Sequence, residues 1–488
     1  MRSPAIIETH ASVLIFLGDR VYKIKKPISL PFLDLRTAGQ RRATLSSELH
    51  LNRRLSPDVY LGLAEFVEPD GQSEPVLCMR RLPHDRRLST LIRTGLCTDR
   101  EVRTIAHDLV AFHQSCEVVA PASTIGSWAH LASLWQDSFE VLEGQSLLFS
   151  PGQISAVRTL AADYLDGRWS LLESRRRAGK IRDGHGDLLA DDIFLLPDGA
   201  RILDCLEFDP ELRCGDTLLD AAFLAMDIER CGSSTLAQVF LDEYRSRSED
   251  DAPISLAHYY IAYRALVRAK VTVLRVEQGD AAAADDARAF VEIASKHLKA
   301  GQVTLTVVSG LPASGKSTLA GLLHERWQAT RTCILLQSDV IRDEVAPMRA
   351  GLSDGIENGR YSPSARAAVY HAMLQRAESA LRSGTDVILD ATCTDSWARA
   401  AVEDLARSCH ARLLALRCQI PAEVAQERLA RRIRGAEARS EADSSVYNRL
   451  ADSSTTWTAA HPINTSAGVD EAYDEVSRLI RQDSPAAM

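Results

Sequence analysis

The sequence predicts a protein of two domains, an α+β domain followed by an α/β domain built on a parallel sheet. A chain of 488 residues is too long for a single hydrophobic core. Near residue 300 the helical spacing of apolar residues gives way to a short β-branched run, 303-VTLTVVSG-310, and a glycine-rich segment follows it. We therefore expect the first domain to span residues 1–300 and the second to span residues 301–488.

Composition predicts an ordinary soluble protein of the cytoplasm. Hydrophobic residues make up 45% and charged residues 25% of the chain, and no apolar run reaches the length of a membrane span. The start, MRSPAIIETH, has no basic segment followed by a long apolar one, so we expect no secretion signal. The ten cysteines form no CxxC pair, which favours reduced thiols over a zinc module. A net charge of −9 argues against a nucleic-acid partner.

The first domain opens with a predicted hairpin and a predicted helix. The hairpin turns at Gly18, and its second strand places Lys23 and Lys25 on one face, because side chains alternate along a strand. The helical pattern that follows carries Glu48. Lysines on strands also serve to prevent aggregation at sheet edges, so their position alone does not assign them a role.

Carboxylates crowd into the stretch 183-DGHGDLLADD-192, and Asp204 follows a nearby apolar run. Like carboxylates repel one another and raise one another's pKa. Such a cluster therefore indicates either a loop on a hydrated surface or a bound cation such as Mg²⁺.

The spacing of three of these residues resembles the aminoglycoside-phosphotransferase branch of the protein-kinase fold. His185-Gly186-Asp187 is followed by Asp192 five residues later and by Asp204 after a strand-like run. The resemblance implies that Asp187 is the catalytic base and that Asp192 and Asp204 bind Mg²⁺. It also implies an N-terminal lobe of about residues 1–85 and a C-terminal lobe of about residues 86–300.

The same resemblance requires a lysine that holds nucleotide phosphates and a helix glutamate that orients it. Glu48 is the candidate glutamate, and either Lys23 or Lys25 is the candidate lysine. The sequence does not decide between the two lysines.

Two features depart from the family pattern. Residue 192 is aspartate where the family has asparagine, and the glycine-rich cover loop is missing, with only Gly18 present. Aspartate binds Mg²⁺ at least as readily as an amide oxygen, but its charge also repels a triphosphate. A slow or non-catalytic first domain therefore stays open as an alternative.

Acidic residues line the stretch after Asp204. They are Glu207, Asp209, Glu211 and Asp216. They are either contacts for a cationic or polyhydroxylated acceptor or solvated loop charges, and we favour loop charges slightly.

The second domain begins with a phosphate-binding loop. The segment from Gly310 to Ser317 matches GxxxxGK[ST], follows a predicted strand and leads into a predicted helix, 316-KSTLAGLLHERW-327. Glycines let backbone N–H groups converge on phosphate oxygens at the helix N-terminus. The nucleotide-binding candidates are Gly310, Ser314, Gly315, Lys316, Ser317 and Thr318. Lys316 would reach the β- and γ-phosphates, and Ser317 would also bind Mg²⁺.

Residues that follow the loop in the sequence indicate which class of P-loop protein this is. Asp339 follows a predicted strand and is placed to accept a proton from an attacking hydroxyl, and Arg342 is placed to fix the acceptor. Asp390 ends a second strand, in a position suited to ordering Mg²⁺. Arg428, Arg431 and Arg432 lie on a helix next to the polar stretch 434–445. That stretch and 349–363 are expected to be mobile loops. Helix capping by Asp339 and a solvated arginine face are the structural alternatives.

This order of motifs resembles the small P-loop kinases of the zeta-toxin, gluconate-kinase and polynucleotide-kinase type over about residues 301–480. That family implies Asp339 as the catalytic base and lid arginines, here Arg428 and Arg432, that clasp phosphates. No NKxD-type motif supports a GTPase. Nearly the whole chain resembles a bacterial family in which an aminoglycoside-phosphotransferase-like domain is fused to a zeta-type ATP-binding domain.

The sequence therefore predicts an enzyme that uses ATP and Mg²⁺ to phosphorylate hydroxyls of small molecules at two sites. One alternative makes the first domain a nucleotide-binding regulatory module and only the second an enzyme. A further alternative, phosphorylation of nucleic-acid ends, is disfavoured by the acidic net charge. Neither the acceptors nor the oligomeric state follow from the sequence.

Overall fold

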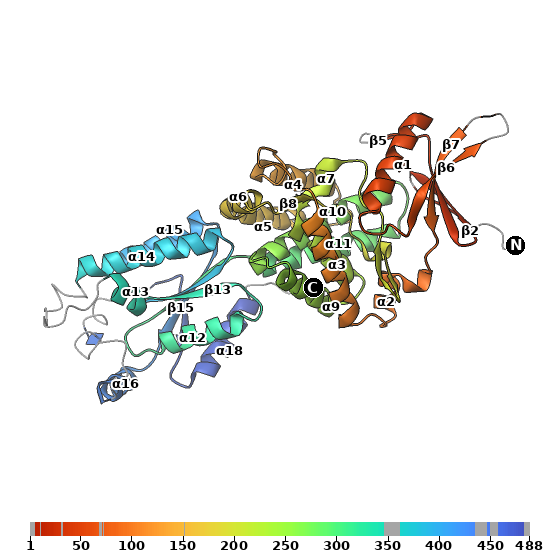
Figure 1. Cartoon of the computed structure of the whole chain (residues 1–488). Coiled ribbons are helices and arrows are strands. Elements are labelled where there is room, and N and C mark those ends of the chain that lie inside the picture. Colours follow the sequence, from red (N-terminus) through yellow and green to blue (C-terminus); the bar gives the residue numbers. More distant parts are fainter. Residues whose placement is uncertain are drawn as a thin grey trace. The chain divides into compact units, whose positions relative to one another are not determined.

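The computed structural model forms two compact units (Figure 1). It describes residues 5–9, 11–30, 33–67, 71, 73–150, 152–345, 362–434, 447–448 and 457–482. The first unit comprises Met1–Ser155, Leu172–Ala252 and Tyr260–His297. The second unit comprises Ala156–Leu171, Pro253–Tyr259 and Leu298–Met488. Two short segments that lie before residue 300 thus fold with the second unit.

The first unit begins with a five-stranded antiparallel sheet in the order β1-β2-β3-β7-β6. Its strands are β1 (Ala5–Glu8), β2 (Ser12–Leu17), β3 (Arg20–Lys25), β6 (Tyr60–Val67) and β7 (Ser73–Arg80). The expected hairpin is β2 and β3, turned at Gly18, whose φ of 61° suits glycine.

Helix α1 (Ala38–Asn52) packs on this sheet. It begins at a capping box in which Thr37 and Gln40 exchange bonds to each other's backbone N–H. Leu45 of α1 is fully buried against Val59 and Leu77. This packing sets the side of the sheet to which Glu48 points.

The rest of the first unit is mainly helical. Its helices are α2 (Leu88–Arg93), α3 (Asp99–Ser115), α4 (Trp128–Glu143), α5 (Gln153–Gly167), α6 (Trp169–Arg177), α7 (Pro210–Arg213), α8 (Thr217–Arg230), α9 (Ser234–Arg247), α10 (Ile254–Glu277) and α11 (Ala283–Ala300). Part of each of α5, α6, α10 and α11 belongs to the second unit. Two small antiparallel pairs, β8 (Ile181–Asp183) with β11 (Cys214–Asp216) and β9 (Ile193–Leu196) with β10 (Gly199–Ile202), frame the acidic stretch. A sheet lobe followed by a helical lobe is a protein-kinase-like α+β fold, so the predicted fold class of this part is confirmed.

The second unit is built on a five-stranded parallel sheet in the order β13-β14-β12-β15-β16. Its strands are β12 (Thr304–Ser309), β13 (Cys333–Gln337), β14 (Asp386–Asp390), β15 (Arg412–Gln419) and β16 (His461–Asn464). The central strand β12 is buried along its whole length, as parallel strands covered on both faces are.

Helices cover both faces of this sheet (Figure 1). They are α12 (Lys316–Trp327), α13 (Ser338–Val345), α14 (Pro363–Arg382), α15 (Ser396–Ser408), α16 (Ala422–Arg434) and α18 (Val469–Gln482). Leu319 and Leu323 of α12 and Val476 of α18 are fully buried against Val308 and Leu416 of the sheet. The second unit is therefore an α/β P-loop fold, as predicted.

Nearly all of the two polar stretches expected as loops, 349–363 and 434–445, lies outside the described residues. No helix within the described ranges is long and apolar enough to cross a membrane.

Candidate functional site

In the first unit, two lysines converge on one buried glutamate. Lys23 Nζ lies 2.6 Å from Glu48 Oε1, and Lys25 Nζ lies 3.0 Å from Glu48 Oε2. Lys25 also contacts Glu207 Oε1 at 2.7 Å. The structure thus joins Glu48 to both candidates, because alternate residues of β3 point to the same face.

Lys23 differs from Lys25 in reaching the carboxylate that follows β10. Lys23 Nζ lies 3.2 Å from Asp204 Oδ1, and this ammonium is the main reason why the pKa of Asp204 is lowered. Asp204 has a φ of 65°, and its N–H donates to Tyr60 Oη at 3.2 Å. A non-glycine residue in the left-handed region is often found at a functional site.

The crowded aspartates separate into two kinds. Asp183 accepts bonds from Arg213 Nε and Nη2 at 2.7 and 2.9 Å, and Asp191 accepts a bond from Ser89. Within the described part of the chain, no hydrogen bond or ion pair is formed by the side chains of Asp187 and Asp192. The first pair of carboxylates is thus structural, while the second is available to a ligand.

Electrostatics support a cation among the available carboxylates. Burial raises the pKa of Asp187 to about 6, with Arg268 opposing the rise and Asp204 adding to it. Burial, then Asp204 and Asp187, raise the pKa of Asp192 well above its ordinary value. No set of three or more potential metal ligands forms among the described residues. Because Mg²⁺ is commonly held by one or two carboxylates together with substrate phosphates, Asp192 and Asp204 fit its needs in chemistry and number.

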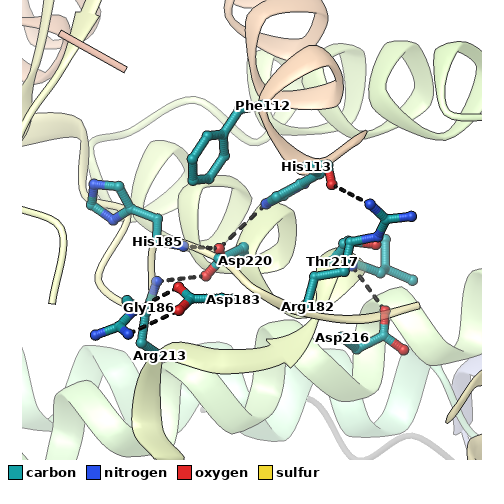
Figure 2. Close-up of polar contacts among 12 residues, drawn as sticks. Phe112, His113, Arg182, Asp183, His185, Gly186, Arg213, Asp216, Thr217 and Asp220 are labelled. Atoms are coloured by element: carbon teal, nitrogen blue, oxygen red, sulfur yellow. Dashed lines mark hydrogen bonds and ion pairs between the residues drawn. The ribbon is translucent and has the colours of Figure 1, made fainter. Parts of the chain in front are cut away.

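Helix α8 holds the loop that carries Asp187 (Figure 2). Asp220 Oδ2 accepts the N–H of His185 at 2.5 Å, and its Oδ1 accepts the N–H of Gly186 at 2.9 Å. Burial opposes ionisation of Asp220, but the contact with His113 Nε2 and the charge of Arg264 outweigh it, so the pKa of Asp220 is lowered. Its carboxylate stays ionised and fixes two consecutive amides of the loop.

A second aspartate of α8 holds the far end of the same loop. Asp227 Oδ2 accepts the N–H of Ala190 at 2.8 Å. Asp220 and Asp227 are seven residues apart and share one helix face. Sequence reasoning missed both, although two aspartates at that spacing in the apolar helix TLLDAAFLAMD are a signal that could have found them.

The acidic residues after Asp204 are largely engaged within the fold. Glu207 binds Lys25, and Asp209 caps α7 by accepting the N–H of Glu211 at 2.8 Å. Asp216 accepts bonds from Arg175 Nε and Nη2 at 2.6 and 2.7 Å. Structural contacts, rather than solvation or an acceptor, account for these three carboxylates.

In the second unit, the phosphate-binding loop has the backbone form that its glycines permit. Gly310, Ala313 and Gly315 have φ values of 144°, 65° and 86°. A Cβ on Gly310 would lie 2.8 Å from Cys418 O, so only glycine fits there. Helix α12 begins at Lys316, as predicted, which directs its N-terminal amides toward the loop.

Polar atoms near the loop are buried without partners. Ser314 Oγ and Asp390 Oδ1 have no hydrogen-bond partner among the described residues. Ser314 is 2% exposed and Asp390 is 4% exposed. Asp390 Oδ2 accepts only a 3.3 Å bond from Gln337. Unpaired buried polar groups are costly, so this site fits a hydrated cation and a phosphate. Ser317 and Thr318 are exposed on the first turn of α12.

The remaining candidate residues of the second unit lie in different surroundings. Asp339 and Arg342 pair with each other on α13. Arg428 Nη2 donates to Thr465 O at 3.0 Å and Nη1 to Ala313 O at 3.4 Å, so this arginine lies beside the loop. The side chain of Arg432 lies outside the described residues.

A cavity of about 280 Å³ adjoins the loop on the α16 side. Its walls include Gly315, Thr318, Arg428, Arg431 and Thr465. The first turn of α12 and two arginines thus face one space, which suits a bound nucleotide.

A family model matches the P-loop part of the chain, and relatives match nearly all of it. Residues 305–455 match the model of the AAA domain family AAA_33. The uncharacterized protein Rv2004c of Mycobacterium tuberculosis H37Rv is 38% identical over 474 residues, covering 96% of this chain and 94% of that one. Mb2027c of Mycobacterium bovis has the same identity and coverage.

Solved structures resemble each part separately. A choline/ethanolamine kinase family protein from Mesorhizobium loti matches 60% of this chain and 90% of its own, with 14% identity and a TM-score of 0.39. Kti12 of Chaetomium thermophilum, solved with ADP-AlF3, matches 36% of this chain and 98% of its own, with 23% identity and a TM-score of 0.27. At such low scores, the fold assignments rest on the sheets described above.

Proposed function

We propose that this chain, which belongs to the family of Rv2004c and itself joins a kinase-like fold to a P-loop fold, is an ATP- and Mg²⁺-dependent kinase with two sites. Each site would transfer the γ-phosphate to a hydroxyl of a small-molecule acceptor. The observation that carries the proposal is the phosphate-binding loop, with α12 starting at Lys316 and unpaired oxygens of Ser314 and Asp390 beside it.

In the second unit, backbone amides of the loop and Lys316 would hold the β- and γ-phosphates. Mg²⁺ would be held by Ser317 and Asp390 and would neutralise phosphate charge. Asp339 would accept the proton of the acceptor hydroxyl as that oxygen bonds to the γ-phosphorus and the bond to the departing ADP breaks. Arg342 would then leave Asp339 to bind the acceptor, while Arg428 and Arg432 would stabilise the transferring group.

In the first unit, the same reaction would use the side chains around Asp204. Lys23, oriented by Glu48, would bind the α- and β-phosphates, and Asp192 and Asp204 would hold Mg²⁺. Asp187 would accept the proton of the acceptor hydroxyl. Lys25, which forms ion pairs with the buried Glu48 and the partly buried Glu207, is the less suitable lysine for the phosphates.

A non-catalytic first unit is the second candidate, and Asp192 is the observation that favours it. An added negative charge next to Asp204 disfavours a triphosphate unless the cation compensates. The first unit would then bind a nucleotide and regulate the second.

Release of ADP from Mg·ATP in the presence of hydroxyl acceptors separates these functions. The full-length protein would be compared with Lys316→Ala, Asp187→Ala and the exposed control Lys299→Ala. We expect Lys316→Ala to remove most turnover and Lys299→Ala to remove none. Turnover that survives Lys316→Ala and is lost on adding Asp187→Ala identifies a second active site. A first site that binds ATP but contributes no turnover is regulatory. A protein that transfers no phosphate to any acceptor contradicts the kinase proposal.

A further inference from the structure

A second cavity also adjoins the phosphate-binding loop, and its described lining has a charge bias. Its volume is about 300 Å³, and its walls include Leu311, Pro312, Thr394, Arg399 and Arg417. No residue of the described ranges lines both this cavity and the one beside α16, so the two cavities are distinct. Among the described residues, two arginines and no aspartate or glutamate line this space, although the chain as a whole carries a net charge of −9.

Arg399 is a buried cation without a carboxylate partner. It is 7% exposed, its Nε donates to Cys393 O at 2.8 Å, and its Nη2 donates to Thr394 O. Within the described part of the chain, no carboxylate forms an ion pair with it. Carbonyl oxygens bond to a guanidinium but do not neutralise it, so a bound anion would supply the missing charge.

Arg417 adds a second positive charge at the end of β15. The amide oxygen of Gln419 accepts a hydrogen bond from Arg417 Nε at 2.9 Å. No ion pair joins Arg417 to a carboxylate of the described residues.

Two of the residues that line this space carry hydroxyl groups without hydrogen-bond partners among the described residues. Ser314 Oγ and Thr394 Oγ1 are buried and unbonded among the described residues. Trp457 closes part of the wall and is fixed by its Nε1 bond to Glu403 at 2.7 Å. Hydroxyl donors, guanidinium groups and an aromatic wall together suit a small polar anion that has a carbon frame.

We propose that this cavity is the acceptor subsite of the P-loop kinase and that its acceptor carries a carboxylate or phosphate group held by Arg399 and Arg417. The inference rests on the proposed kinase function of the same unit. The two cavities beside the loop would then receive the two substrates, with the nucleotide beside α16 and the acceptor beside the end of β15 and the segment that follows β14.

The test measures binding of matched neutral and anionic polyols to the full-length protein saturated with Mg·ADP, which occupies the phosphate loop itself. Suitable pairs are glycerol with glycerate, glycerol with glycerol 3-phosphate, and ribitol with ribonate, titrated by calorimetry. We expect the anionic member to bind at least about tenfold more tightly than the neutral one.

Arg417→Gln should abolish this preference while leaving affinity for Mg·ADP unchanged, and Arg417→Lys should retain part of it. Arg412→Gln, at the opposite end of β15, is the matched control and should bind like the wild type. If no anionic compound binds better than its neutral partner, or if Arg417→Gln keeps the preference, the inference is overturned. Failure of the proposed function gives a different result, namely binding of Mg·ADP that is absent or indifferent to Lys316→Ala.

Discussion

At the scale of single residues, Lys23 and Lys25 share one carboxylate but not one environment. Lys25 is 4% exposed and bonded to Glu48 and Glu207, whereas Lys23 is 14% exposed and bonded to Glu48 and Asp204. The more buried lysine is thus held between two carboxylates of the fold, and the other reaches the proposed metal ligand. The sequence could not separate them, because both sit on the same face of β3.

Substituting each lysine by methionine distinguishes a structural role of the side chain from a role in nucleotide binding. We expect Lys25→Met to lower the free energy of unfolding by about 3 kcal/mol, since it leaves two carboxylates short of their buried partner. Lys23→Met should instead weaken nucleotide binding at the first site more than it affects stability. Urea unfolding and nucleotide titration in the Lys316→Ala background measure the two effects. Equal effects of both substitutions on both measurements would contradict this division.

A second prediction at this scale concerns pH. Burial opposes ionisation of Asp250, but hydrogen bonds from Arg175 lower its pKa to about 2. A lowered pKa in the folded state gives stability that is complete above about pH 4 and is lost as the pH falls toward about 2. We expect Asp250→Asn to cost about 2 kcal/mol at pH 7. In urea unfolding at pH 7, 4 and 3, that cost should shrink with the pH; a constant difference would contradict the assignment.

At the scale of elements, α8 fixes the loop of Asp187 through a close approach that only glycine permits. A Cβ on Gly184 would lie 2.3 Å from Asp220 Oδ2, whereas a Cβ on Gly62 would meet nothing within 4 Å. We expect Gly184→Ala to cost about 1–3 kcal/mol and to displace Asp187 from its working position. Gly62→Ala, with neither a contact nor a left-handed φ, is the matched control and should change stability by less than about 0.5 kcal/mol.

Thermal unfolding and turnover of the first site measure both variants. A Gly184→Ala protein as stable and active as Gly62→Ala would show that α8 does not constrain the loop.

Elements set by local pattern could be predicted from the sequence, and elements set by distant contacts could not. The loop from Gly310 and the helix from Lys316 to Trp327 were predicted to the residue, because glycine positions and helix periodicity are local properties. The contacts of Asp220 were missed, because its partners at residues 185 and 186 come from a different part of the chain. The second cavity was missed for the same reason, since the ends of β12 and β15 and the segment that follows β14 each supply part of its wall.

At the scale of the whole molecule, the second unit includes chain from the first half of the sequence. Arg168 is fully buried, and its guanidinium donates to Leu381 O at 2.7 Å, Cys409 O at 2.9 Å and His410 O at 3.0 Å. These carbonyls lie at the ends of α14 and α15, where free carbonyls and the helix dipole favour a cation. Ser255 Oγ adds a bond of 2.7 Å to Gly384 O.

A fragment starting at residue 298 should therefore be less stable than the same unit within the full chain. In the full chain, we expect Arg168→Met to lower the stability of the second unit by about 3 kcal/mol, since three buried carbonyls lose their donor. Arg407→Met, at a side chain that is 74% exposed, is the control and should have little effect. Thermal unfolding with and without Mg·ADP reports on this unit, and a fragment as stable as the parent unit would refute the prediction.

The segments Ala156–Leu171 and Pro253–Tyr259 also bear on how such a protein can be inherited. If the two halves were independent units joined end to end, a single crossover near residue 300 would be enough to exchange the P-loop half between relatives. In this chain such an exchange leaves Arg168 and Ser255 facing foreign helix ends. Active hybrids should therefore arise only when Ala156–Leu171 and Pro253–Tyr259 are exchanged together with the rest of the second unit.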